Sequence, residues 1–165
     1  MSTGVVVREA RQGDHEFILS LARRLAECDL PRWRTPEEVE TGTRRWLENA
    51  IGAPSATSCI LVAESTGADL LGFIFIHEQR DFFTREPCAH ISDIAVTARA
   101  EGTGAASLLM AAAERWAQVN GYRQIELNVF AGNERARKMY DRLGYAVETV
   151  KYVKVVEGVT PEIAL

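Results

Sequence analysis

The sequence has few cysteines, and they form no pattern that would indicate a metal site or a disulfide framework. Its three cysteines, Cys28, Cys59 and Cys88, are widely spaced, and no C-x-x-C motif occurs. An odd, unpatterned set is typical of reduced intracellular thiols. The apolar stretch at residues 5–7 is too short for the hydrophobic region of a signal peptide. We therefore expect a cytoplasmic protein without a bound metal.

Long hydrophobic runs and a large excess of one charge are also absent. No apolar run approaches the roughly 20 residues of a membrane-spanning helix. The net charge is −4, so bulk electrostatics do not favour nucleic acid or an anionic membrane as a partner. The 165 residues contain no internal repeat and suit one domain of ordinary size. We therefore expect a single domain over residues 1–165 that binds neither nucleic acid nor membrane.

Periodicity in the first third of the chain predicts one strand followed by two helices. The β-branched run at 5–10 is typical of a strand. Apolar residues at helical spacing over 18–25 predict an amphipathic helix with Arg23 and Arg24 on its solvent side. The sequence Thr-Pro-Glu-Glu at 35–38 supplies a cap, a proline for the first position and two acids for the first turn, so a second helix begins there.

The rest of the chain alternates strands with helices. Strands are predicted over 58–63, 70–77 and 89–96, with a hairpin loop at 65–69 and a polar loop at 79–87. There follow a helix over 105–119, a strand over 125–129, a helix capped by Asn133 that ends at Gly144, and a β-rich strand or hairpin over 145–156. Because hairpins join the middle strands, this order favours an α/β fold, of the α+β type, in which helices flank both faces of a mixed central sheet.

The stretch from 91 to 145 carries the clearest functional signal, centred on small residues between a strand and a helix. Positions 102–107 read Gly-Thr-Gly-Ala-Ala-Ser, which lets the backbone approach a ligand closely. Free N–H groups at the start of the next helix would bind an anion such as a pyrophosphate. A glycine-containing turn without a ligand is the alternative. The run is not a Walker A loop, because no Gly-Lys-Ser/Thr occurs, and it lacks the third glycine of a Rossmann fingerprint.

Residues 101–106 read Glu-Gly-Thr-Gly-Ala-Ala, and Asn133, Ala136, Tyr140 and Gly144-Tyr145 follow. Together these motifs, at their spacing, resemble the Gcn5-related N-acetyltransferase (GNAT) family. That family's Q/R-x-x-G-x-G/A loop matches residues 101–106, and its N-x-x-A-x-x-x-Y-x-x-x-G-F/Y pattern matches 133–145. The resemblance covers residues 88–150 closely. Glu101 departs from the usual Arg or Gln, and starting the loop at Arg99 would restore a basic residue but shorten the spacing from Val96. The resemblance implies a GNAT-like fold and an acetyl-CoA-dependent N-acetyltransferase of EC class 2.3.1, acting through a ternary complex.

For the cofactor, the resemblance implies contacts along a strand, a loop and a helix. The strand at 94–96 is expected to separate from its neighbour at 127–129, so that free backbone groups bind the pantetheine arm and the Val96 N–H polarises the thioester carbonyl. Tyr140 would protonate the leaving thiolate, and its alternative role is that of a core aromatic. The implied acetyl-CoA-binding residues are Ile94, Ala95, Val96, Glu101, Gly102, Thr103, Gly104, Ala105, Ala106, Ser107, Asn128, Asn133 and Tyr140.

A general base is also needed, because the acceptor amine must lose a proton to attack the thioester. The resemblance implies an acid or a histidine on the strand at 89–96. His90 and Ser92 have the parity of Ile94, so we expect them on one face and Asp93 on the other. His90, acting through a water chain, is the first candidate, and Asp93 and Glu78 follow. A satisfied core histidine is the alternative for His90.

Acceptor recognition is expected in residues 28–40 and 78–88, which vary among such folds. These stretches mix aromatic and charged side chains, which suits the primary amine of a small polar molecule. A solvated surface loop is the alternative. The candidate acceptor-binding residues are Trp33, Arg34, Glu78 and Phe82. An acceptor at a protein N-terminus or lysine, and a non-catalytic acetyl-CoA-binding module, are the competing functions. A homodimer that uses the β-rich tail is a further possibility.

Overall fold

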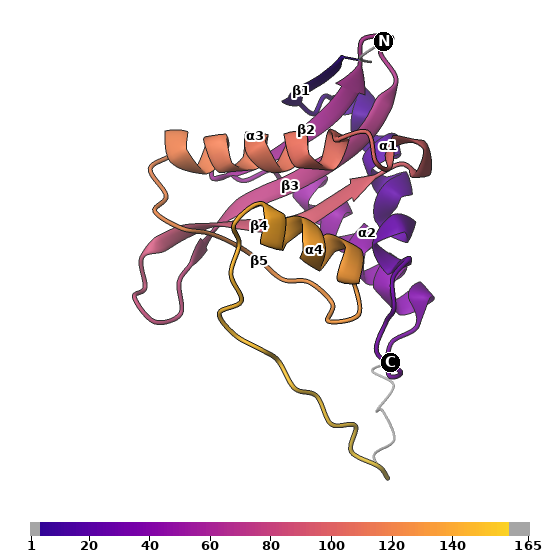
Figure 1. Ribbon diagram of the computed structural model, residues 1–165, viewed down its shortest axis with the longest axis vertical. Helices are drawn as coiled ribbons and strands as arrows, with labels where there is room; N and C mark the ends of the chain where they lie inside the picture. The colour runs from indigo at the N-terminus through magenta and orange to yellow at the C-terminus, as the bar shows by residue number, and fades with distance from the viewer. Residues whose placement is uncertain (1–3, 159–165) are drawn as a thin grey trace.

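A twisted sheet of five strands forms the middle layer of the protein in the computed structural model, which describes residues 4–158 (Figure 1). Its strands, which neighbour one another in chain order, are β1 (Val5–Glu9), β2 (Ser58–Ser65), β3 (Leu70–Arg80), β4 (Pro87–Val96) and β5 (Ile125–Leu127). Strands β1 to β4 pair antiparallel, whereas β4 and β5 run parallel. The sheet is therefore mixed, as the hairpins in the sequence predicted.

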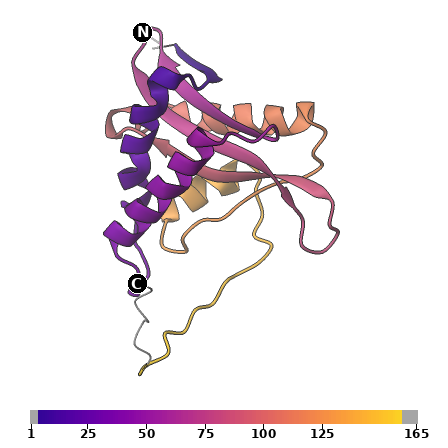
Figure 2. The same cartoon turned by 180° about the vertical axis from the view of Figure 1, so that it is seen from behind.

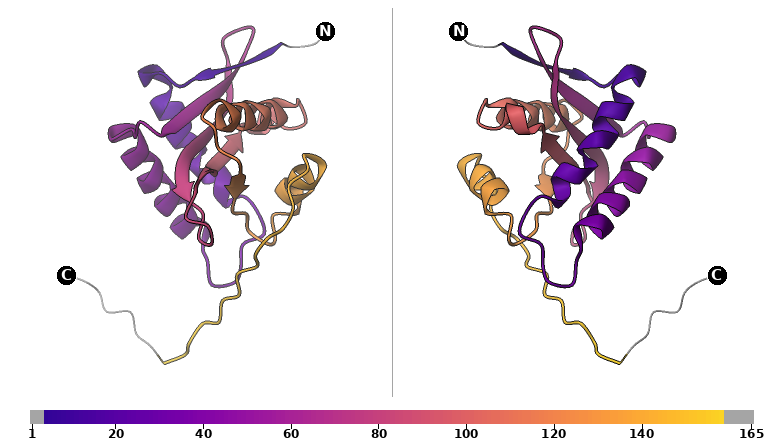
Figure 3. Two further views of the ribbon diagram at one scale, coloured as in Figure 1. Left: turned by 90° about the vertical axis from the view of Figure 1, so that its left-hand side faces the viewer. Right: turned by 90° about the vertical axis from the view of Figure 1, so that its right-hand side faces the viewer.

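Helices cover both faces of this sheet (Figures 2 and 3). On one face lie α1 (His15–Ser20), the 3₁₀ turn η2 (Leu21–Ala26) and α2 (Pro36–Gly52); on the other lie α3 (Ala105–Val119) and α4 (Glu134–Arg142). Alternate residues of β3 serve the two cores: Phe73 packs with Leu47 of α2, and Ile74 packs with Leu109 of α3. The predicted fold, a mixed sheet with helices on both faces, is confirmed. None of the helices within residues 4–158 has both the length and the apolar composition to cross a bilayer.

The predicted helix starts are also present. Thr35 accepts a hydrogen bond from the Glu38 N–H and donates its own N–H to the Glu38 carboxylate, which completes a capping box for α2. Asn133 caps α4 by accepting from the Ala136 N–H at 3.2 Å. Local side-chain hydrogen bonds therefore determine where α2 and α4 begin.

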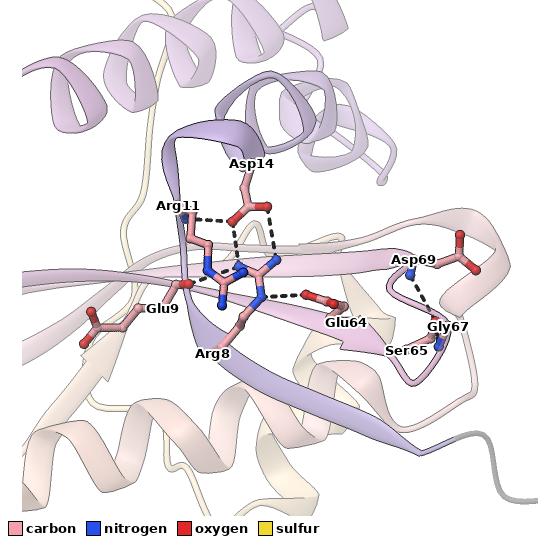
Figure 4. Close-up of polar contacts among 8 residues, drawn as sticks. All are labelled: Arg8, Glu9, Arg11, Asp14, Glu64, Ser65, Gly67 and Asp69. Atoms are coloured by element: carbon pink, nitrogen blue, oxygen red, sulfur yellow. Dashed lines mark hydrogen bonds and ion pairs between the residues drawn. The ribbon is translucent and has the colours of Figure 1, made fainter.

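Arg8 ties the first strand to the rest of the fold (Figure 4). Its guanidinium donates two hydrogen bonds to the Asp14 carboxylate, at 2.7 and 3.2 Å, and one to Glu64 of β2 at 2.5 Å. Asp14 ends the 3₁₀ turn η1 (Gln12–Asp14), is 6% exposed and also accepts from the Arg11 N–H. The cluster therefore joins β1, β2 and the first helical turn through mostly desolvated groups.

The polar loop predicted over 79–87 is shorter than expected. Strand β3 continues to Arg80 and β4 begins at Pro87, so only residues 81–86 turn. Asp81 closes this turn, because its Oδ1 accepts from the N–H groups of Phe83 and Thr84 at 3.0 and 2.6 Å. The strands of this hairpin are longer than predicted, because polar residues can form a strand where their side chains are exposed to solvent.

The first helix also differs from its prediction. The α-helix stops at Ser20, and the chain continues as the 3₁₀ turn η2. Three residues per turn instead of 3.6 shift the phase of the side chains that follow. Arg24, predicted to face solvent, instead donates from Nε to the Val96 carbonyl at the end of β4, at 3.1 Å.

The prediction of a strand or hairpin over 145–156 is wrong. This segment contains no strand and runs away from the sheet as an extended chain (Figure 3). Val147 is 72% exposed and Tyr152 is 93% exposed. A β-branched sequence favours the extended conformation, but a strand also requires a partner for its backbone hydrogen bonds, and the described residues supply none.

Candidate active site

The pairing of β4 with β5 ends halfway along β4. The two strands pair at only three positions, and the last pair joins Ile91 to Leu127. From there to Val96 the edge of β4 has no strand beside it among the described residues. The separation expected near 94–96 is therefore confirmed, and a cavity of about 780 Å³ opens in the gap.

Most of the residues predicted for the cofactor surround this cavity. Its walls come from β4, the loop before α3, the chain after β5, and α4, with η2 and α2 on the opposite side. The predicted residues that line it are Ile94, Ala95, Val96, Glu101, Gly102, Gly104, Ala106, Ser107, Asn128, Asn133 and Tyr140. Residues distant in the sequence are thus brought together by the fold.

The backbone of Val96 faces the gap. The Thr97 N–H donates to Leu71 of the neighbouring β3, at 2.8 Å. Backbone groups alternate in direction along an antiparallel strand, so those of Ile94 and Val96 point away from β3. The Val96 carbonyl accordingly accepts its hydrogen bond from Arg24 rather than from β3. The Val96 N–H therefore lies where the resemblance required a free donor.

The loop before α3 presents a set of free backbone donors. Gly102 and Gly104 have φ values of +73° and +87°, a region that disfavours residues with a Cβ. Among residues 4–158, the N–H groups of Gly102, Gly104, Ala106 and Ser107 donate to no protein acceptor. All four residues line the cavity, at the positive end of a helix 15 residues long. This arrangement suits an anionic ligand.

Two residues predicted for the loop hold it together instead. The Thr103 hydroxyl donates to the Ala100 carbonyl at 2.6 Å, and Ala105 is fully buried in the core beneath α3. Neither residue lines the cavity. Thr103 and Ala105 shape the loop, while Gly102, Gly104 and Ala106 line the cavity.

Glu101 lies between two arginines at the rim of the cavity. Its Oε1 accepts from Arg24, and its Oε2 pairs with Nη1 of Arg135 on α4 at 2.7 Å. The hydrogen bond from Arg135 and then that from Arg24 hold the pKa of Glu101 below its ordinary value. Arg99 points elsewhere, towards Asp69 and the Leu70 carbonyl, so it contributes no charge here.

Tyr140 lies at the cavity floor, on the face of α4 that packs against the sheet. It is 8% exposed, and burial raises the pKa of its phenol to about 12. Asn133, two turns earlier, uses its side-chain oxygen for the helix cap and keeps its NH₂ group for other contacts. Helix α4 thus brings one buried hydroxyl and one amide to the same side of the cavity.

A β-bulge at Ser92 overturns the parity expected for His90. Phe75 pairs with Asp93 but Ile76 pairs with Ile91, so Ser92 is the extra residue. The bulge reverses the alternation on its N-terminal side, so His90 and Asp93 face α2 while Ile91 and Ile94 face α3. The side-chain direction predicted for His90 was therefore wrong, because a bulge inserts a residue into the period of two.

His90 itself lies outside the cavity lining. Its Nδ1 is 3.2 Å from the Glu126 carboxylate, and its ring centroid is 5.2 Å from that of His77. Burial lowers the pKa of the imidazole, although Glu126 opposes this. His90 is thus a largely buried histidine with a carboxylate partner.

Asp93 does line the cavity. Its Oδ2 is buried without a hydrogen-bond partner among the described residues. Burial raises the pKa of this carboxyl above its ordinary value. The adjacent Ser92 hydroxyl accepts from the Trp46 indole at 2.7 Å, which ties the bulge to α2. Asp93 therefore combines a position in the cavity lining with a buried, unsatisfied acceptor.

Only one of the four predicted acceptor residues lines the cavity. Arg34 does so, whereas Trp33, Glu78 and Phe82 do not. Glu78 accepts from the Tyr122 hydroxyl at 2.9 Å, and Phe82 is 80% exposed at the tip of the β3–β4 hairpin. Their assigned role stays a prediction, made from loops whose direction the sequence does not reveal.

Other residues of the cavity escaped sequence reasoning. Helix α2 presents Glu38, Gly42 and Thr43, and α4 presents Arg135. Gly42 gives a signal in the sequence, because glycine inside a helix costs about 1 kcal/mol of stability relative to alanine. A glycine at such a position suggests that the helix needs a small residue there, for packing or for function. The Asn133 cap predicts from the sequence that Arg135 lies in the first turn of α4. The sequence does not predict its ion pair with Glu101.

Comparison with known proteins agrees with this geometry. Residues 19–145 match the model of the acetyltransferase (GNAT) family. Two relatives come from Bacillus subtilis (strain 168). The uncharacterized N-acetyltransferase YycN is 34% identical over 77 residues, which are 47% of this chain and 48% of that protein, so this match spans about half of the relative's length. The uncharacterized N-acetyltransferase YhfO is 29% identical over 143 residues, 87% of this chain and 91% of that protein.

Solved structures share the fold. A protein from Pyrococcus furiosus described as an acetyl transferase superimposes with a TM-score of 0.75 at 26% identity, over 93% of this chain and 100% of that one. Aminoglycoside N-acetyltransferase AAC(6')-Iy, in complex with CoA, has a TM-score of 0.67 at 17% identity, over 96% and 98% of the two chains. At that identity the likeness concerns the fold. Since the family match covers well over half of the sequence, the chain belongs to the acetyltransferase (GNAT) family and is an N-acetyltransferase by class, an acyltransferase of EC 2.3.1.

Proposed function

We propose that the protein transfers an acetyl group from acetyl-CoA to the primary amine of a small molecule by direct attack in a ternary complex. The observation that carries this proposal is one cavity that joins the gap between β4 and β5, the four free N–H groups before α3, and the buried groups Asp93 and Tyr140. When bound there, acetyl-CoA would supply the activated thioester. The structural neighbour AAC(6')-Iy holds CoA in the same fold, which supports the choice of cofactor.

The residues present fit the parts of that cofactor. The open edge of β4 offers backbone groups to an extended amide-containing arm, and the Val96 N–H can donate to a carbonyl oxygen where negative charge develops. The N–H groups of Gly102, Gly104, Ala106 and Ser107 can donate to phosphate oxygens. A cavity of about 780 Å³ is large enough for a ligand of drug size and above.

Asp93 is the proposed base in place of the histidine favoured by parity. Asp93 lines the cavity, and burial raises the pKa of its carboxyl towards neutral pH, where a base accepts a proton more effectively. A cationic amine would also be attracted to the carboxylates of Asp93 and Glu38 at this wall. His90 does not line the cavity, so it could accept the proton of the amine only through an intervening water molecule or side chain.

Tyr140 is the proposed proton donor to the departing sulfur. With a pKa of about 12, its phenol remains protonated throughout the neutral range. It can therefore donate a hydrogen bond to a thiolate at every pH at which the protein would work. A neighbouring group is not needed to keep it neutral.

Direct attack fits the composition of the cavity. None of Cys28, Cys59 and Cys88 lines it. Burial raises the pKa of each of the three thiols, that of Cys59 to about 11, which disfavours the thiolate that a covalent acetyl intermediate would require. We therefore propose sequential kinetics rather than a ping-pong reaction.

The activity is tested by incubating the protein with acetyl-CoA and a panel of acceptors, followed by mass spectrometry and detection of free CoA. The panel holds polyamines, aminoglycosides, amino acid amides, and peptides with a free N-terminus or lysine. Acetylation of a small amine with intersecting initial-rate lines supports the proposal. Acetylation of peptides alone would replace the acceptor class, and acetyl-CoA binding without any turnover would favour the non-catalytic module.

The proposed base gives a sharper test. Asp93→Asn should lower kcat/KM by about 10²-fold at neutral pH, with partial recovery at higher pH as the free amine accumulates. His90→Gln is the comparison, and it should change kcat/KM by less than about 3-fold. The reverse order of effects would restore His90 as the base and reduce Asp93 to a structural acid.

Three further predictions from the sequence belong to this proposal. A single domain over residues 1–165, a cytoplasmic location and a possible homodimer all stay predictions. The β-rich tail was the expected dimer interface, and its valines are exposed in the described part of the chain. Size-exclusion chromatography with light scattering would determine the oligomeric state.

A further inference from the structure

The rim of the cavity carries a cluster of charges that the proposed reaction does not use. Glu101 bridges Arg24, which comes from η2 on one side of the sheet, and Arg135, which comes from α4 on the other. All three side chains line the cavity beside the free N–H group of Gly102. Arg24 also pairs with Glu27, so the two arginines are matched by two carboxylates.

The two arginines are held very differently. Arg24 donates to Val96, Glu27 and Glu101, and its side chain is 24% exposed. Arg135 is 63% exposed, and Glu101 is its one ion-pair partner among the described residues. A guanidinium with one exposed partner can change partner at little cost, whereas a guanidinium with three cannot. Arg135 is therefore the member of the cluster that can exchange its partner most readily.

Helix stability does not account for Arg135. It is the second residue of α4, in the first turn, where the helix dipole disfavours a cation. Glu134 precedes it and provides the acid that this end of the helix favours. A cation at this position thus lowers the stability of the helix but adds positive charge to the rim of the cavity.

An anion bound at the N–H groups before α3 would come close to the Glu101 carboxylate. The two negative charges would repel each other unless a cation moved between them. Arg135 is placed for this move, because its fork of donors binds carboxylate and phosphate in the same geometry. Glu101 thus pairs with the guanidinium that a bound phosphate would need.

We propose that Arg135 binds the pyrophosphate of the CoA thioester and that Glu101 is an internal competitor, which holds Arg135 until the phosphate replaces it. This inference rests on the proposed function and adds to it two residues that set cofactor affinity. Glu101 then weakens binding of acetyl-CoA and of product CoA alike, and so favours release of the product. Arg24 keeps its contact with Val96 in both states.

A double-mutant cycle tests the competition. Calorimetric titration with CoA would compare the wild type, Glu101→Gln, Arg135→Gln and the double variant. Arg135→Gln should weaken CoA binding by about 10-fold, and Glu101→Gln should tighten it by about 3–5-fold. In the double variant the gain from Glu101→Gln should disappear, because the residue it competes for is missing. Lys138→Gln, which removes one positive charge from α4 outside the cavity, should leave affinity unchanged.

Truncated ligands locate the contact. 3'-Dephospho-CoA, which retains the pyrophosphate, should repeat the pattern, and pantetheine, which has no phosphate, should bind all variants equally. An equal gain from Glu101→Gln with and without Arg135 would overturn the competition, and so would weaker binding in Glu101→Gln alone. An effect seen with CoA but not with 3'-dephospho-CoA would overturn the assignment to the pyrophosphate. Failure of the wild type to bind CoA would instead overturn the proposed function.

Discussion

Tyr140 brings a hydroxyl from α4 to the cavity. The ring packs among the buried residues of the α3 side, 5.9 Å from the ring of Tyr145, so the backbone and the ring position are fixed by packing. Burial is also what keeps the phenol protonated. Under the proposed function, this side chain has two separable roles: packing through the ring and proton donation through the oxygen.

Removing only the oxygen separates these roles. Tyr140→Phe should lower kcat by about 10²-fold while CoA affinity stays within a few-fold, because the thiolate loses its donor and the ring remains. Steady-state kinetics and thermal denaturation on the same sample measure this. Tyr145→Phe is the matched control, since it deletes a neighbouring hydroxyl that does not line the cavity. Full activity in a stable Tyr140→Phe variant would leave Tyr140 as a packing residue.

At the scale of elements, the junction between the loop and α3 forms the proposed anion site. Gly104 is the N-cap of α3 at φ +87°, and no atom lies within 4 Å of the position that a Cβ would take. Under the proposed function, the cofactor would occupy this open space. A side chain at this position would therefore meet the cofactor rather than the protein.

Gly104→Ala should consequently affect binding more than stability. The left-handed backbone costs an alanine roughly 1–2 kcal/mol of folding free energy, and the methyl group should weaken CoA binding by at least about 10-fold. Gly121→Ala is the control: its φ is +78°, its Cβ position is equally open, and it lies at the other end of α3 outside the cavity. Chemical denaturation and calorimetry should show equal destabilisation in both variants and weaker binding only in Gly104→Ala. Weaker binding in both would point to a distorted helix.

At the scale of the whole molecule, β1 depends on the cluster of Arg8, Asp14 and Glu64. Strand β1 is at the edge of the sheet, five residues long and paired only with β2. The ion pair of Arg8 with Asp14 is bidentate and mostly buried, so it is worth more than an exposed pair. The hydrogen bond from Arg8 lowers the pKa of Asp14 despite the opposing effect of burial.

Asp14→Asn should therefore destabilise the fold by about 2–3 kcal/mol at neutral pH. Because the pKa of Asp14 is lower in the folded state, its contribution is complete above the unfolded value of about 3.9 and is lost as the pH falls through the folded value. The difference between wild type and variant should thus be largest at neutral pH and shrink below about pH 4. Urea denaturation across this range measures it. Glu48→Gln, which removes an exposed pair with Arg44, should cost no more than about 0.5 kcal/mol.

Local chemistry explains why much of the fold was predictable. The Thr35 capping box, the Asn133 cap and the small residues at 102–107 act within a few residues, so they leave a signature in the sequence. Helix α3 spans the predicted residues 105–119 for the same reason. The loop and Tyr140, which depend on these elements, accordingly line the cavity, and their roles in binding and catalysis stay predictions.

The sequence alone determined the family resemblance, the mixed sheet and the loop before α3, because spacing and capping are properties of neighbouring residues. Only the tertiary structure decided which side chains enter the cavity. The bulge at Ser92 turned His90 away from the face of Ile94, and the 3₁₀ turn brought Arg24 to Val96. In the sequence, Glu101 is an acid where the family usually has a basic or amide residue. The structure places Arg135 of α4 beside it as an ion-pair partner. Such contacts join residues tens of positions apart, and a one-residue change in phase redirects every side chain that follows it.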